Sequence, residues 1–314
     1  MDAPWNNLRW DADLIETDGG VTVRLDDGSG STCLLRHVSA GVRACLAALD
    51  RGRPWSEARR LVPAEEEFAV RRLVHELLEA GLARRSPAPR PAEVCLIGGG
   101  ATARRLAREL LGVPAVRLTV IAPEPSPFGG LADQPTDAAC ALRAGLVQND
   151  PGNQARIRCD ASWATLTEGG FDLVVVTPAS IQPDRSITAH LIRHSLPFLP
   201  VLVHRGWLRI GPLADYEGAC LHCCDLTLAD ADPGWPEAVE QLSRQPARPD
   251  AGLSRLAASL AGRYAAWFLA GDGNALRSLT LEASLTTPGL AWRSWPSHPD
   301  CACSWEPLAD AVAA

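Results

Sequence analysis

Two pairs of cysteines stand out among the residues of this chain that could do chemistry. Cys220 and Cys223 form a C-x-x-C pair in "CLHCCDL", and Cys301 and Cys303 form a second tight pair in "HPDCACSW". The first spacing lets two thiolates share one tetrahedral metal ion, and two such pairs supply the four sulfur ligands that structural zinc prefers. A site with four protein ligands leaves no open position for catalysis. The sequence therefore predicts a structural zinc site.

Two alternatives to a zinc site stay open for these cysteines. One is a redox C-x-x-C pair, for which the neighbouring sequence lacks the thioredoxin-like context. The second is a set of ordinary buried cysteines, which does not account for the pair near the C-terminus. The adjacent Cys224 is expected to be a core residue, with a substitute ligand or an activated thiol as alternatives. The isolated cysteines lie in apolar contexts and are expected to be small core residues: Cys33, Cys45, Cys95, Cys140 and Cys159.

The composition argues against several classes of protein. The chain has 314 residues and a net charge of −7, which disfavours attraction to phosphate backbones, so we expect no nucleic-acid partner. No apolar run approaches the roughly 18 to 20 residues of a membrane helix, and the N-terminus lacks the features of a secretory signal. We therefore expect a cytoplasmic protein with no membrane partner. All 30 basic residues are arginines, because the chain contains no lysine.

A proline-rich stretch, "RRSPAPRPAEV" at 84–94, divides the chain into two predicted parts. We expect a first domain at 1–86, a linker at 87–93 and a second domain at 94–314. In the first domain, alternating segments around "DDGSGS" predict a β-hairpin. Three helical patterns follow: one capped by Ser39 and ending near Asp50, one at 55–62, and one starting near Pro63. These elements predict a small winged-helix-like module.

Such a module has three uses that the residues alone leave open. DNA binding is the first, but the third helical segment is acidic, which disfavours a recognition helix. Capture of an extended peptide at the sheet edge is the second, and dimerisation or simple packing is the third. The charged residues of this segment are Glu65, Glu66, Glu67, Glu76 and Glu79 against Arg71 and Arg72.

The second domain begins with a strand, a glycine turn and a helix in "AEVCLIGGGATARRLARELL". Gly98, Gly100 and Ala103 fit the G-x-G-x-x-G/A pattern of nucleotide-binding folds, although small residues here are also needed to pack the helix against the strand. The next predicted strand ends in Ala122 and Pro123, with only Glu124 nearby, where a dinucleotide site would hold a ribose with an acidic residue. The motif alone is therefore weak evidence for a bound nucleotide.

Further patterns along the second domain predict an open α/β sheet with helices on both faces. The apolar run "FDLVVVTP" is typical of a buried parallel strand, and "PVLVHRGWLRIGPL" indicates two more strands. The remaining predicted elements are helices at 186–194 and 251–270 and a late strand in "LRSLTLEASL".

Taken together, the glycine-turn motif, "GACLHC" and the terminal cysteine pair resemble the E1-like, ThiF-type adenylyltransferase fold. "GACLHCCDLTLADADPGWP" and "WPSHPDCACSW" are similar to the ThiF-like proteins that make thiazole- and oxazole-containing peptides and thiopeptides. This resemblance covers most of the chain. It implies that the N-terminal module is a precursor-peptide recognition element, which binds the leader of a ribosomally made peptide. It also implies that the ThiF-like body docks onto a YcaO cyclodehydratase.

The resemblance also assigns the peptide-binding residues. The leader would extend the hairpin edge and pack against the third helix. The residues implied are Thr32, Cys33, Leu34, Leu35 and Arg36 on the strand, and Val70, Leu73, Val74 and Leu77 on the helix.

Departures from the active E1 pattern bear on catalysis. Active members handle ATP and magnesium with an aspartate after the second strand, an arginine in the next loop and a lysine on a nearby helix. Here the strand ends "VIAPEPSPFGG", no arginine follows until Arg143, and there is no lysine. Phosphoryl chemistry then lacks its main electrostatic stabilisers. We therefore expect no bound ATP, with Gly98, Gly100, Ala103 and Glu124 forming a vestigial nucleotide loop.

The sequence thus predicts a non-catalytic scaffold that binds a leader peptide and delivers the precursor to a YcaO enzyme for azoline formation. Two alternatives are an active adenylyltransferase acting on a peptide C-terminus and a winged-helix DNA-binding regulator. A nicotinamide-dependent oxidoreductase is a poorer alternative, because the acidic residue after the second strand is missing. The oligomeric state stays open, with a homodimer as one option.

Overall fold

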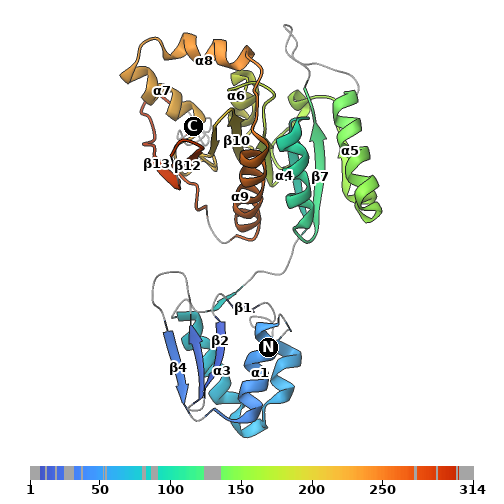
Figure 1. Ribbon diagram of the computed structural model, residues 1–314, viewed down its shortest axis with the longest axis vertical. Coiled ribbons are helices and arrows are strands. Elements are labelled where there is room, and N and C mark those ends of the chain that lie inside the picture. Colours follow the sequence, from blue (N-terminus) through green and yellow to red (C-terminus); the bar gives the residue numbers. More distant parts are fainter. Residues whose placement is uncertain are drawn as a thin grey trace, which may run out of the picture. The chain divides into compact units, whose positions relative to one another are not determined.

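The chain folds into two compact units, Met1–Ala88 and Pro89–Ala314 (Figure 1). The computed structural model describes residues 8–10, 13–17, 20–24, 32–36, 38–51, 53, 55–79, 83–85, 91–123, 136–271, 274–287, 289–301 and 303. Strand β6 (Ala92–Ile97) begins inside the stretch at 87–93 that the sequence suggested as linker. No helix in these described ranges is long and apolar enough to cross a membrane.

The first unit contains a three-stranded antiparallel sheet with the order β2-β3-β4. Strands β3 and β4 are the predicted hairpin, and their antiparallel pairing confirms it. The sequence patterns missed β2, whose "DLIET" has acidic residues at two of five positions. The strands are β2 (Asp13–Thr17), β3 (Gly20–Arg24) and β4 (Thr32–Arg36), and a separate antiparallel pair joins β1 (Leu8–Trp10) to β5 (Ala83–Arg85). Within the described part of the unit, β4 therefore has one free edge.

Helices pack together to form the core of this unit. The Ser39 side chain accepts a hydrogen bond from the Val42 amide at the start of the first helix, which confirms the predicted cap. Trp55 is fully buried among aliphatic side chains of the other helices. The helices are α1 (Ala40–Asp50), α2 (Trp55–Ala58) and α3 (Glu67–Glu79), with 3₁₀ turns at Arg59–Leu61 and Ala64–Glu66.

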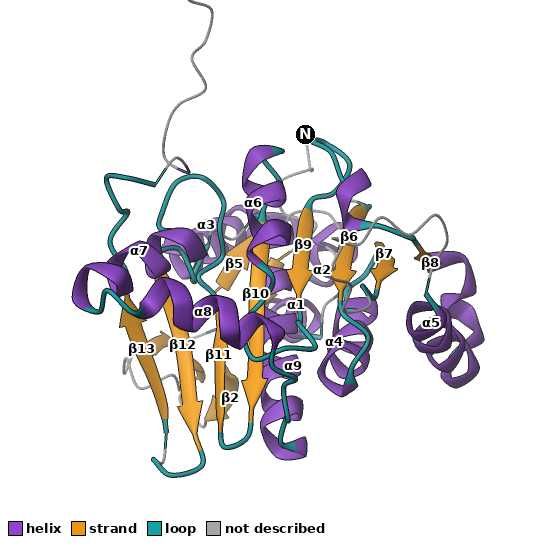
Figure 2. Ribbon diagram, turned by 90° about the horizontal axis from the view of Figure 1, so that it is seen from above, coloured by secondary structure: helices purple, strands orange, loops and turns teal. Residues whose placement is uncertain are grey.

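The second unit is built on an eight-stranded sheet with the order β13-β12-β11-β10-β9-β6-β7-β8 (Figure 2). The five strands from β8 to β10 are parallel, and β11, β12 and β13 extend the sheet in antiparallel fashion. The further strands are β7 (Val116–Ile121), β8 (Ile157–Cys159), β9 (Leu173–Val176), β10 (Phe198–His204), β11 (Trp207–Ile210), β12 (Leu279–Ser284) and β13 (Leu290–Ser294).

Helices cover both faces of this sheet, as the sequence predicted. Apolar residues of α4, α5 and α9 form one core with the sheet, and those of α6 and α7 form the other. The helices are α4 (Ala101–Gly112), α5 (Asp137–Asn149), α6 (Arg185–Arg193), α7 (Leu221–Ala231), α8 (Trp235–Arg244) and α9 (Ala251–Leu269). The sequence patterns missed α5, α7, α8, β8 and β13.

Helices α4 and α9 lie side by side at close distance (Figure 1). Thr102 of α4 donates a hydrogen bond to the hydroxyl of Ser254 at the start of α9, at 3.1 Å. Further along, an added Cβ at Gly262 would lie 2.5 Å from the Cβ of Glu109. Gly262 is therefore required by helix contact rather than by its backbone conformation.

We expect Gly262→Ala to lower the free energy of unfolding by about 1 to 2 kcal/mol, because the overpacking cost exceeds the gain in helix propensity. The matched control is Gly112→Ala at the exposed end of α4, where an added Cβ would meet nothing within 4 Å. Urea denaturation followed by circular dichroism measures both. Equal stability of the two variants would show that the helices do not approach each other as described.

Candidate metal centre and switch-point loop

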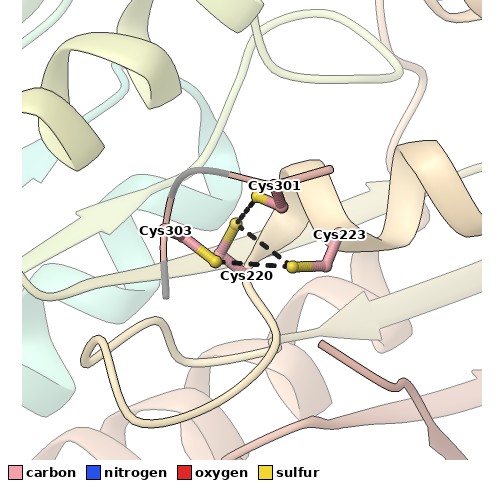
Figure 3. A group of neighbouring side chains, drawn as sticks. All are labelled: Cys220, Cys223, Cys301 and Cys303. Carbon is pink, nitrogen blue, oxygen red and sulfur yellow. Dashed lines mark hydrogen bonds between the residues drawn. The ribbon is translucent and has the colours of Figure 1, made fainter. Parts of the chain in front are cut away.

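The two cysteine pairs lie together in the second unit. The sulfur atoms of Cys220, Cys223, Cys301 and Cys303 are all within 4.8 Å of one another, and all four side chains are buried. The Sγ–Sγ distances are 3.9 Å between Cys220 and Cys223, 3.6 Å between Cys220 and Cys301, and 3.4 Å between Cys223 and Cys303. Figure 3 shows the four sulfurs pointing toward a common centre.

This geometry fits a tetrahedral metal ion. Metal–sulfur bonds of about 2.3 Å in a tetrahedron place the sulfurs about 3.8 Å apart, close to the distances found. Four thiols brought together without a cation would instead compete for the same hydrogen bonds in a buried space. The cluster could therefore hold a metal ion, and a full set of four sulfur ligands gives it a structural rather than a catalytic character.

Helix α7 brings the first pair into position. Cys220 is the residue before its first turn, and Cys223 lies within that turn, so both sulfurs face the same side. The helix is held against α6 by Asp225, which accepts two hydrogen bonds from the Arg185 guanidinium at 2.6 and 2.9 Å. The indole of Trp235 donates a further bond to Asp225. A partly buried bidentate pair of this kind fixes orientation as well as position.

The second pair is carried by the segment that follows β13. Trp295 anchors this segment, because its buried indole donates to the hydroxyl of Thr280 at 3.1 Å and its amide donates to the Ser278 carbonyl. Three residues later, His298 donates from Nε2 to Asp230 of α7 and accepts at Nδ1 from the Asp300 amide. The returning segment is thus pinned to β12 and to α7 before it reaches Cys301.

Neither histidine near the cluster is among the four grouped ligands. The hydrogen bond to Asp230 raises the pKa of His298, because the carboxylate favours the protonated ring. His222 is exposed on α7. Patterns of residue type did not reveal the His298–Asp230 contact, which joins positions distant in sequence.

The remaining cysteines divide between interior and surface. Cys224 is buried beside the cluster but lies outside the set of four, and burial raises the pKa of its thiol, which therefore stays protonated. Its expected role as a core residue is confirmed. Cys45 and Cys95 are also core residues, whereas Cys159 is half-buried. The expectation was wrong for Cys140, which is exposed on α5 because the helix turns that position toward solvent. For Cys33 the structure describes only the backbone of β4.

The glycine loop lies where the order of the parallel strands reverses. Strand β6 pairs with β7 on one side and with β9 on the other, so its carboxyl end is the topological switch point at which open α/β sheets bind ligands. Gly98 there has φ of +148°, and an added Cβ would lie 2.2 Å from Thr177 Oγ1 and 2.3 Å from its carbonyl oxygen. Gly98 is thus needed for packing against Thr177, the residue directly after β9, whether or not a nucleotide binds. Ala103 is buried beneath the loop, and Gly100 has open space around it.

No ionisable side chain directly follows β6, β7 or β9 in the described part of the chain. The residues there are Gly98 to Gly100, then Ala122 and Pro123, then Thr177 and Pro178. Arg143 is already engaged, because its Nε donates to the Ile157 carbonyl on β8, two strands away from the switch point. Glu124, predicted as part of the loop, lies outside the described residues.

The predicted peptide-binding residues of α3 occupy two environments. Val70, Val74 and Leu77 are buried in the core of the first unit, with exposed fractions of at most 1%. Leu73 is half-buried and packs at the border of this core. Leu73 is therefore the most accessible of the four predicted α3 residues. On the strand, Thr32 to Arg36 form β4, whose outer edge has no described partner strand.

Comparison with known proteins identifies the class of fold. No family model matches the chain, and no curated protein matches it in sequence. Among solved structures, E. coli MccB with AMPCPP and MccA matches with a TM-score of 0.58 at 11% identity, covering 95% of this chain and 99% of that one. This likeness extends over both units, and the mixed α/β architecture with its eight-stranded sheet is consistent with an E1-like, Rossmann-type fold.

Two further structures carry the same fold. E. coli MccB with ATP matches with a TM-score of 0.55 at 11% identity, covering 95% of this chain and 100% of that one. The heterocyclase TruD matches with a TM-score of 0.53 at 14% identity, covering 95% of this chain but 43% of that one. MccB is described as a microcin C7 biosynthetic enzyme and was solved in complex with N-formylated MccA. At these identities the likeness shows the fold alone.

We expect the purified chain to hold about one metal ion and Cys220→Ser to lose it, because three thiolates bind a tetrahedral ion far more weakly than four. Loss of the ion should lower the free energy of unfolding by at least about 2 kcal/mol, which corresponds to a fall in Tm of roughly 5 °C. Elemental analysis and a thermal melt measure the two effects. Cys224→Ser, beside the cluster, is the matched control and should retain the metal. Retention of metal by both variants would contradict the four-cysteine site.

Gly98→Ala should destabilise the second unit by at least about 2 kcal/mol, since the alanine meets both a strained φ and the backbone of Thr177. Gly100→Ala in the same loop should stay within about 1 kcal/mol of the parent chain. Chemical denaturation of the two variants without any nucleotide provides the comparison. If Gly98→Ala were neutral, the packing role assigned to this glycine would be wrong.

Proposed function

We propose that this chain is a leader-peptide-binding scaffold in the maturation of a ribosomally synthesised peptide. Its first unit would bind the leader of a precursor peptide, and its second unit would present the precursor to a separate YcaO-type cyclodehydratase for azoline formation. The free edge of β4 is the observation that carries the proposal. It belongs to a small antiparallel sheet in a unit distinct from the E1-like body.

Strand addition suits this edge. An extended leader paired with β4 would satisfy the outward amide and carbonyl groups of the strand, and its side chains would reach the flank of α3 at Leu73. Backbone pairing tolerates variation in the leader sequence, while a few apolar contacts select it. Binding the leader near the partner enzyme raises the effective concentration of the core peptide there.

The features of α3 support peptide binding over DNA binding. Its arginines are engaged on the helix itself, since Arg71 contacts Glu67 at 2.8 Å and Arg72 contacts Glu76 at 3.4 Å. A DNA-binding helix needs such cations free to neutralise phosphates. A winged-helix regulator is therefore the weaker proposal for this unit.

The second unit would act as a scaffold without using ATP itself. Adenylation requires cations and magnesium ligands around the phosphates. The described ends of β6, β7 and β9 supply neither, and the whole chain contains no lysine. We further propose zinc as the ion of the four-cysteine site, since zinc matches both the ligand type and the tetrahedral spacing. When bound, it would tie the segment after β13 to α7.

Hydrogen exchange provides the sharpest test of leader binding. We expect the precursor's leader peptide to slow amide exchange in residues 32–36 of β4, because strand addition gives their outward amides a partner. Strand β2, at the opposite edge of the same sheet, is the internal control and should exchange at an unchanged rate. Protection of β2 alone, or no protection in the first unit at saturating leader, would contradict the proposal.

Two substitutions on α3 distinguish a specific contact with the leader from nonspecific hydrophobic binding. Leu73→Ala should weaken leader binding about fivefold, since it removes roughly 1 kcal/mol of apolar contact. Phe68→Ala removes a side chain that is 78% exposed on the same helix and should leave the affinity unchanged. Fluorescence anisotropy of a labelled leader measures both. A larger loss for Phe68→Ala would place the peptide elsewhere.

An active adenylyltransferase is the second candidate, favoured by the likeness to MccB, whose structures include a complex with ATP. Such an enzyme should exchange labelled pyrophosphate into ATP when the precursor is present. We expect no exchange above background, because none of the described residues directly after β6, β7 or β9 is charged and the chain has no lysine. Exchange that depends on the precursor would establish the second candidate and overturn the scaffold.

A further inference from the structure

Strand β13 forms an open edge of the large sheet. It pairs with β12 along one side, and none of the described strands pairs with its other side (Figure 2). All five of its residues, Leu290–Ser294, are exposed. An edge of this length presents unpaired amide and carbonyl groups that can accept another strand, and proteins usually block such edges unless they use them.

The two faces of β13 differ in chemistry. Successive side chains of a strand point to opposite faces, so Leu290 and Trp292 share one face, while Ala291 and Arg293 share the other. On the first face, Trp292 lies edge-on to Tyr264 of α9 at 6.2 Å between ring centroids. On the second, the Arg293 guanidinium stacks over Trp295 at 4.0 Å.

The first face is unusually apolar. Among the described residues, every exposed large hydrophobic side chain of the second unit belongs to α9, to β13 or to the turn between β12 and β13. These residues are Leu256, Leu285, Leu290 and Trp292, and Trp292 is 52% exposed. Leu290 and Trp292 lie on the open edge strand itself, and large exposed apolar side chains on such an edge are typical of an interaction surface.

Two arginines near the β13 edge have no ion-pair partner among the described residues. Arg293 has no carboxylate within ion-pair distance among the described residues, because the nearby Glu282 is bound to Arg209 at 2.8 Å. On α9, Arg263 stacks over Trp267 at 4.8 Å and likewise has no carboxylate partner in the described ranges. On a chain whose net charge is −7, a surface with unpaired arginines favours an acidic partner.

We propose that β13 binds an extended acidic segment of a protein partner as a ninth strand of the sheet. The segment would carry apolar side chains at alternate positions against Leu290 and Trp292, and a carboxylate on the other face against Arg293. Resting on the function proposed above, we assign this segment to the cyclodehydratase. The leader would then bind one unit and the enzyme the other.

A second copy of the chain fits this edge less well. Two β13 strands paired in antiparallel fashion around Trp292 would place both Arg293 side chains at diagonal positions on one face. Long arginine side chains at diagonal positions come within reach of each other, so their like charges disfavour this pairing, and Glu282 on the same face of β12 is already bound to Arg209. The charge pattern therefore selects an acidic partner over self-association.

The test measures two affinities of the full chain: for the labelled leader peptide by anisotropy, and for the purified cyclodehydratase from the same gene neighbourhood by biolayer interferometry. We expect Arg293→Glu and Trp292→Ser each to weaken binding of the cyclodehydratase by about tenfold or more, as at central contacts of an interface. Leader affinity should not change. The matched control is Arg108→Glu, an exposed arginine of α4, which should alter neither affinity. Unchanged thermal melts would show that the variants fold.

Three other results would contradict the β13 inference, either alone or together with the proposed function. If the parent chain bound neither leader nor enzyme, the proposed function and the inference would both fail. If it bound the enzyme and both β13 variants bound equally well, the β13 inference alone would be wrong. If Trp292→Ser converted a dimer into a monomer in sedimentation velocity while enzyme binding persisted, the edge would be a contact between two copies, which also overturns the inference.

Discussion

The cluster of four buried cysteine sulfurs is the constraint that fixes the C-terminal part of the second unit, from α7 to the segment after β13. It joins the first turn of α7 to a segment that comes about eighty positions later in the chain, as the Cys220–Cys301 and Cys223–Cys303 contacts show. Between these two points the chain forms α8, α9, β12 and β13. A metal ion at this site would close that long loop, and loop closure restricts the unfolded chain most when the loop is long. Trp295 and His298 hold the returning segment on β12 and α7 at the same place.

The switch-point loop shows how packing can require a glycine of a nucleotide-binding motif. In an open α/β sheet, the carboxyl end of β6 is where a ligand would sit, and the glycine pattern there suggests a nucleotide. Gly98, however, is required because any side chain would collide with Thr177, the residue directly after β9. The charges that phosphate chemistry needs do not directly follow β6, β7 or β9 among the described residues. Glycine spacing therefore carries less functional information here than the residues at the strand ends.

Much of the fold could be predicted from the sequence because its elements carry strong local signals. The apolar runs of β6, β7 and β9, the cap at Ser39 and the long pattern of α9 all match observed elements. The missed elements lack such signals. Helix α7, which begins at the first cysteine pair, mixes apolar and polar residues around its axis, and β13 is exposed at all five positions. Neither segment therefore shows a regular hydrophobic periodicity. Their structure is set by contacts with distant residues, which local patterns do not contain.

The candidate metal site was predictable to the residue, because ligand type and spacing determine it. Its supporting contacts were not, since the Arg185–Asp225 and His298–Asp230 pairs join positions remote in sequence.

In the proposed function, this chain holds the leader while another enzyme performs the chemistry. ATP consumption by the cyclodehydratase, measured with and without this chain on precursors with and without the leader, is the sharpest test of this role. We expect the chain to stimulate consumption only when the substrate carries its leader, because stimulation arises from tethering. Equal stimulation with a leaderless core peptide would contradict it.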